Sequence, residues 1–173
     1  MTISLYDASV ASYLQLLGGV SGFLDRGVSH CEENGLDLGE IVETSLFPDM
    51  LPFRFQIQAV AHHSLGAMKG LKAGVFHPSA GVAKATYQNL QALVADTRSA
   101  LAALSPEEVN ALSGKDMAFE AGDFRMLFTS ETFILSFSLP NFYFHATTAY
   151  DILRMKGVPL GKRDFVGQRR TKG

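Results

Sequence analysis

The sequence predicts an all-α protein, an up-down bundle of four helices with a short β-hairpin between the third and fourth helices. Apolar residues recur at steps of three and four along four long stretches, the spacing that places side chains on one stripe of a helix. One short stretch alternates instead, as the strands of a hairpin do. Since 47% of the 173 residues are hydrophobic, the chain can bury one sizeable core, and we expect one domain over residues 1–173.

The first helix is expected from about Ser4 to Glu33, because Gly35 just beyond it can adopt the positive φ of a helix end. The second follows a loop through Pro48 and ends near Gly74. The two apolar stripes are Val10, Tyr13, Leu14, Leu17, Val20, Leu24 and Val28 in the first helix, and Phe53, Ile57, Val60, Ala61, Met68 and Leu71 in the second.

The third helix is predicted over about residues 80–104, and Ser105-Pro106 then signals a stop and a short helical restart. The hairpin is predicted over residues 117–128. The fourth helix covers about residues 130–156 and is kinked at Pro140 or begins anew there. The tail from residue 158 shows no periodicity, so we expect it on the surface or against a neighbour.

Composition argues against several classes of protein. The 15 Lys and Arg nearly balance the 17 Asp and Glu, so no strong positive field would attract nucleic acid. The apolar runs are too short to span a membrane, and the first thirty residues lack the pattern of a secretory signal. We therefore expect a cytoplasmic protein with no nucleic-acid or membrane partner. The lone Cys31 has no second cysteine with which to form an internal disulfide.

Polar side chains near the predicted core are the candidate site residues. On a helical wheel, Gln56 and His63 flank the stripe of the second helix, while His62 points to the opposite side. In the fourth helix His145 lies on the inward face, one turn after Asn141, which is a natural hydrogen-bond partner for it. We therefore expect His145 to be buried and His62 to be exposed.

Two interpretations of these histidines stay open. His63 and His145 can converge on a metal or small ligand from facing helices, or they can be core histidines hydrogen-bonded to Asn or Gln. Asp49 can add a carboxylate to such a site, or it can cap the N-terminus of the second helix.

Three segments carry a resemblance to a known family: residues 47–50 (FPDM) leading to Gln56, residues 139–150 (LPNFYFHATTAY), and residues 157–165 (GVPLGKRDF). The chain resembles an uncharacterised bacterial domain-of-unknown-function family in the DinB/YfiT-like superfamily of metalloenzymes. The resemblance covers nearly the whole chain. It implies a DinB-like four-helix bundle, frequent homodimers and, in better-known relatives, a divalent metal such as Zn or Ni held by three histidines.

The resemblance carries over to two of those three histidines. His63 lies where the second helix of the superfamily offers its histidine, and His145 matches the first histidine of the HxxxH pair on the fourth helix. Ala149 stands where the second member of that pair would be. A site with two imidazoles needs a carboxylate or water to complete it, so we expect divalent metal to bind weakly or not at all.

We therefore expect a small-molecule-binding protein whose pocket lies between the second and fourth helices, or a degenerate metal-dependent enzyme of the thiol-transferase or hydrolase type. Ligand-binding candidates are Gln56, Asn141 and Tyr150, the last residue of the second motif; metal candidates are His63, His145 and Asp49. The alternative is a non-catalytic dimeric interaction or stress-response module, in which these polar groups only fix the packing of the core.

Overall fold

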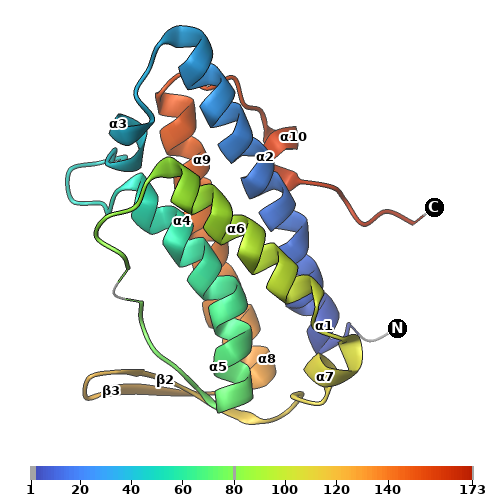
Figure 1. Cartoon of the computed structure of the whole chain (residues 1–173). Coiled ribbons are helices and arrows are strands. Elements are labelled where there is room, and N and C mark those ends of the chain that lie inside the picture. Colours follow the sequence, from blue (N-terminus) through green and yellow to red (C-terminus); the bar gives the residue numbers. More distant parts are fainter. Residues whose placement is uncertain (1–2, 80, 173) are drawn as a thin grey trace.

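The computed structural model describes residues 3–79 and 81–172 and shows a mostly helical chain with a small sheet at one end (Figure 1). The long helical segments run side by side, and the sheet projects from their lower end in this view. The predicted mostly helical chain with one hairpin is confirmed. The described elements are α1 (Leu5–Ala8), α2 (Val10–Asn34), α3 (Leu38–Val42), α4 (Phe53–Ala61), η1 (His62–Gly66), α5 (Ala67–Ala73), β1 (Val75–Phe76), α6 (Tyr87–Ala102), α7 (Pro106–Asn110), β2 (Asp116–Ala121), β3 (Phe124–Thr129), α8 (Ser130–Phe133), η2 (Ile134–Ser138), α9 (Leu139–Met155) and α10 (Lys162–Val166).

The first predicted helix is two helices, because the chain bends at Ser9, between α1 and α2. The side chain of Ser4 accepts a hydrogen bond from the backbone N–H of Asp7 and so caps α1. Gly35, at φ 63°, ends α2 as predicted. The predicted stripe faces the core, where Tyr13 and Leu17 are fully buried.

The second predicted helix contains a π-helical turn that the sequence pattern did not indicate. This turn, η1, separates α4 from α5, and the whole segment ends at Gly74, at φ 76°, as expected. Pro52 is the N-cap residue of α4. The predicted stripe is buried on both sides of the π turn, from Phe53 to Leu71.

The third helix starts later than predicted, at Tyr87 instead of about residue 80. Its start is set by a capping box in which Thr86 and Asn89 satisfy each other's backbone N–H groups. The predicted short restart is confirmed as α7, which is capped in the same manner by Ser105 and Glu108.

The predicted hairpin is confirmed and slightly longer than expected, with β2 and β3 paired from Asp116 and Thr129 to Ala121 and Phe124. Strand β1, which was not predicted, pairs in parallel with β2 and completes a three-stranded sheet. Two residues directly after a helix carry too little pattern to announce a strand, because the pairing that makes them one comes from far along the chain.

The fourth helical segment is continuous through α8, η2 and α9. Pro140 is the second residue of α9, directly after the π-helical turn η2, so the irregularity expected at the proline takes this form. The tail then forms α10, which packs on α2. A Cβ on Gly19 would collide with the backbone carbonyl oxygen of Phe165, so this glycine permits the contact.

Within the described residues, no helix combines the length and the apolar character needed to cross a membrane.

Candidate functional site

Two imidazole rings meet between the second and fourth helical segments. His63 lies in η1 and His145 in α9, and both side chains are half-buried. Their rings are nearly parallel, at 16°, and their centroids are 5.7 Å apart. The predicted convergence of these two histidines is therefore what the fold produces.

Gln56 fixes the orientation and the tautomer of His145. The Gln56 amide nitrogen donates to the Leu51 carbonyl at 2.7 Å, so the amide oxygen is the atom that faces His145 Nδ1, also at 2.7 Å. An amide oxygen only accepts hydrogen bonds, and this network therefore assigns the proton of His145 to Nδ1. The lone pair is left on Nε2, in the arrangement that outer-shell partners impose on ligand histidines.

His63 lies among aromatic rings and lacks one hydrogen bond. Its ring centroid is 5.6 Å from that of Phe76 and 5.9 Å from that of Phe137. The His63 Nδ1 atom is buried and has no hydrogen-bond partner among the described residues. A buried polar atom left in this way costs free energy that a bound group would recover.

A chain of hydroxyl groups holds the π-helical turn of His63 in place. Ser138, at the end of η2, donates to the His63 carbonyl at 2.6 Å, and the Tyr13 hydroxyl lies 2.6 Å from Ser138 Oγ. Because the Ser138 proton is committed to the carbonyl, Tyr13 is the donor in the second bond. Burial raises the pKa of Tyr13 far above its usual value, which keeps this donor protonated.

Both imidazoles are neutral at physiological pH. Burial, with smaller contributions from His145 and His62, lowers the pKa of His63 from 6.5 to about 3. Burial likewise lowers the pKa of His145 from 6.5 to about 4. A neutral imidazole has a lone pair that can accept a hydrogen bond or bind a metal. The two rings can therefore act as hydrogen-bond acceptors or as metal ligands.

The other sequence-predicted residues take no part in this cluster of contacts. Asn141 is half-buried and donates to the Phe137 carbonyl at 2.7 Å, so Gln56, not Asn141, is the partner of His145. Tyr150 packs edge-on against Phe23 and Phe165, on the side of α9 that faces α2 and α10.

The exposed Asp49 lies in the turn before α4. It does not cap α4, because Pro52 is the N-cap residue of that helix and makes no side-chain cap bond. The capping interpretation of Asp49 is therefore wrong.

The expected contrast between a buried His145 and an exposed His62 is also wrong, since both side chains are half-buried. The segment after α5 folds back and covers His62. Its ring stacks on Phe76 at 4.4 Å, and its Nε2 donates to the His77 carbonyl at 2.8 Å. His62 lines a cavity of about 370 Å³ whose lining includes neither His63 nor His145.

The separation of the two ring centroids is compatible with a shared divalent metal, whereas the number of ligands is too small. Two imidazoles bound to one zinc ion at 2.0–2.1 Å place their ring centroids about 5 Å apart, close to the separation of this pair. Within residues 3–79 and 81–172, however, no group of three or more His, Cys, Asp or Glu side chains is placed to hold a metal. If His63 and His145 held a metal, they would supply only half of a tetrahedral ligand set among the described residues.

Sequence reasoning missed Ser138 and Phe76, which position His63. Ser138 resembles any serine in a helical stretch, and its role depends on a bond to a residue 75 positions away. No local signal marked it, because Pro140 frees a carbonyl of its own helical segment and not the carbonyl of His63.

The helical architecture has a solved counterpart. A crystal structure of a DinB family member protein from Shewanella denitrificans matches 98% of this chain and 95% of its own length, with a TM-score of 0.82 and 22% sequence identity. This likeness defines the class of fold as DinB-like. A model of the family described as "Domain of unknown function (DUF1993)" matches residues 5–166, and the chain belongs to that family. No curated protein matches the sequence.

Proposed function

We propose that this chain is a small-molecule-binding protein of the bacterial cytoplasm, whose ligand lies between α4–η1 and α9 at His63, His145 and Gln56. In this proposal the four long helical segments are the helices of an up-down bundle, and any divalent metal is held weakly by the two imidazoles. The observation that carries the proposal is the buried, unpartnered Nδ1 of His63 beside the ring of His145.

The ligand is expected to bring a hydrogen-bond donor on an apolar body. His145 Nε2 carries a lone pair, because Gln56 holds the ring by Nδ1. The aromatic rings of Phe76 and Phe137 surround His63 and favour an apolar or aromatic neighbour. A hydroxyl or thiol group on an aromatic frame satisfies both conditions.

An enzymatic form of this proposal, a thiol transferase or a hydrolase, needs a metal. A bound divalent ion would supply Lewis-acid activation of a water or thiol. His63 and His145 would hold it, and Gln56 would keep the His145 ring in the ligating tautomer. With only these two imidazoles, the residues do not complete the site, and we derive no catalytic step.

A matched series of aromatic probes tests the binding site. We would titrate untagged protein with 2-phenylethanethiol, 2-phenylethanol and ethylbenzene and follow the imidazole C–H resonances by NMR. The thiol and the alcohol should shift the resonances of His63 and His145, whereas ethylbenzene should not. Equal binding of all three compounds, or shifts confined to other histidines, would contradict the proposal.

A separate experiment tests the metal. Protein purified without a His-tag should contain far less than one zinc or nickel per chain, and Ala149→His should raise zinc affinity at least about tenfold by restoring a third imidazole. Ala149 is fully buried, so Ala149→Gln serves as a control of similar size, with circular dichroism to verify folding. Near-stoichiometric metal in the wild-type protein, lost in His145→Gln, would overturn weak binding and favour the enzyme.

The second candidate function is a non-catalytic homodimeric interaction or stress-response module. The observation that favours it is the exposure of two adjacent large residues of α9, Tyr143 at 42% and Phe144 at 56%. Sedimentation of the wild type should then show a dimer, which Phe144→Ser should weaken. Phe124→Ser in the hairpin removes an equally exposed ring, 58%, and is the control.

A further inference from the structure

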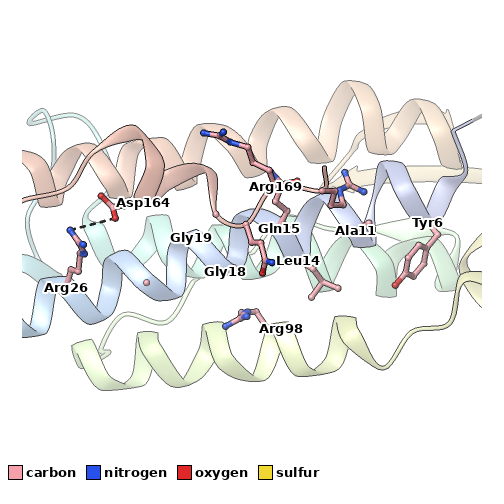
Figure 2. Close-up of a pocket in the computed structure, with 14 residues that line it drawn as sticks. Tyr6, Ala11, Leu14, Gln15, Gly18, Gly19, Arg26, Arg98, Asp164 and Arg169 are labelled. Carbon is pink, nitrogen blue, oxygen red and sulfur yellow. Dashed lines mark ion pairs between the residues drawn. The ribbon is translucent and has the colours of Figure 1, made fainter. Parts of the chain in front are cut away.

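A groove of about 670 Å³ lies along α2 (Figure 2), and its lining includes neither His63 nor His145. Helix α6 contributes Arg98 to one side, and the segment after α10 contributes Arg169 to the other, with Gly18 and Gly19 between them. Arg170 also lines the groove. Leu14 and Gly22 of α2 also line it. The groove therefore combines a floor of mainly small and apolar residues, with Gln15 among them, and sides on which arginines predominate.

Two glycines of the floor, Gly18 and Gly22, are not explained by packing within the described residues. A Cβ on Gly18 or Gly22 would meet nothing within 4 Å, whereas one on Gly19 or Gly27 would collide with Phe165 or Tyr87. Glycine is among the poorest helix formers, and Gly18 and Gly22 lie in the interior of α2. What their missing side chains provide is open space directly over the helix backbone.

The sides of the groove concentrate positive charge in a chain whose net charge is −2. Four arginines and one aspartate line it. Asp164 lies 3.7 Å from Arg26, and Arg170 donates to backbone and hydroxyl oxygens near the start of the chain. Arg98 and Arg169 are exposed and form no ion pair with any described residue. Two guanidinium groups are thus available to an anion.

We propose that this groove binds one amphipathic anion, a carboxylate or phosphate monoester on a slim apolar body. Guanidinium groups bind both kinds of head group with paired hydrogen bonds, so Arg98 on one side of the groove or Arg169 on the other would hold the head. The body would lie over Leu14, Gly18 and Gly22, where the absence of side chains allows close approach. The volume falls within the range of about 300–1,000 Å³ typical of small-molecule sites.

Calorimetric titration tests the proposal with decanoate and decyl phosphate as probes, and decanol and inorganic phosphate as controls, all below micellar concentrations. At least one of the two anions should bind with a stoichiometry near one. Decanol and inorganic phosphate should bind at least tenfold more weakly, because decanol lacks the anionic head group and inorganic phosphate lacks the apolar body. Decanol binding as tightly as the anions, or no heat from either anion, would overturn the proposal.

Substitutions locate the site. Arg98→Gln combined with Arg169→Gln should weaken anion binding at least tenfold, while Arg163→Gln, an exposed arginine of α10 outside the groove lining, should leave it unchanged. Gly18→Leu should abolish binding without lowering the melting temperature, since it fills open space and removes a helix-interior glycine. Wild-type affinity in the double arginine variant would refute the site.

A lipid surface is the other source of such an anion, and vesicles distinguish it. The wild-type protein should stay in solution when phosphatidylglycerol vesicles are sedimented, because the floor of the groove lies between α6 and the tail. If the wild-type protein sediments with the vesicles and the double arginine variant does not, the ligand is a membrane surface and not a soluble anion. Because these variants leave His63 and His145 untouched, failure here is distinct from failure of the histidine site.

Discussion

Acid should destabilise this protein through its two neutral histidines. The pKa of His63 is about 3 and that of His145 about 4 in the folded chain, against 6.5 for the ordinary side chain. As the pH falls below about 6.5, these two imidazoles become protonated in the unfolded chain but stay neutral in the folded chain. The destabilisation is therefore absent above about pH 6.5 and grows as the pH falls, toward about 4 for His145 and about 3 for His63.

The size of the effect follows from the two shifts. Since one pKa unit corresponds to about 1.4 kcal/mol, each imidazole would remove about 2 kcal/mol of unfolding free energy at about pH 5 if its full shift counted. Both rings are half-buried, so solvent screens part of the effect. We therefore expect the pair to lower the free energy of unfolding by about 2 kcal/mol, roughly half of the full sum, between about pH 7 and pH 5.

Urea unfolding followed by circular dichroism measures this loss, with EDTA present to remove metal. The His63→Phe variant should lose about half of the acid sensitivity, because a phenyl ring suits its aromatic surroundings and does not titrate. His77→Gln changes an exposed histidine and should behave like the wild type. Equal unfolding free energies at both pH values, or an unchanged pH dependence in His63→Phe, would refute the reasoning.

Three further substitutions, one of them with a matched control, test contacts in the fold. Gln56→Leu leaves Nδ1 of His145 without its acceptor and should cost about 1–3 kcal/mol in urea unfolding, with a broadened His145 resonance by NMR; unchanged stability and resonance would disprove the contact. Ser138→Ala removes the donor to the carbonyl of the π-helical turn and should cost about 1–2 kcal/mol, with faster amide exchange in η1; unaltered exchange would count against a positioning role. Gly19→Ala should release α10 and expose the tail to protease. Its control, Gly18→Ala, should stabilise the chain by about 0.5–1 kcal/mol. Identical digestion of the two variants would contradict the packing assigned to Gly19.

Local signals were enough to predict most of the helical framework. Gly35 and Gly74 end helices because their positive φ is easily reached only by glycine, and Ser105 begins α7 by satisfying free N–H groups. The hairpin follows from alternation around a turn at Gly122, at φ 59°. Each of these choices involves residues a few positions apart, so the sequence alone carries the information.

The candidate site was predicted in part. Wheel positions brought His63 and His145 to facing surfaces, and the structure places their rings together. The same reasoning paired His145 with Asn141, one turn away, whereas the partner is Gln56, 89 positions away. It also placed His62 on the outside, because a helical wheel does not show that the segment after α5 folds back and covers the His62 ring with Phe76.

The sequence by itself determined where helices begin and end and which stripe of each is apolar, because those properties depend on neighbours within a few turns. Only the tertiary structure decided that Ser138 donates a hydrogen bond to the carbonyl of His63 and that β1 pairs with the hairpin. It also decided that Gly19 packs against the backbone of Phe165 while Gly18 faces an open groove. These outcomes depend on groups brought together from distant parts of the chain, whose competition for one hydrogen bond or one space is resolved only when the helices pack.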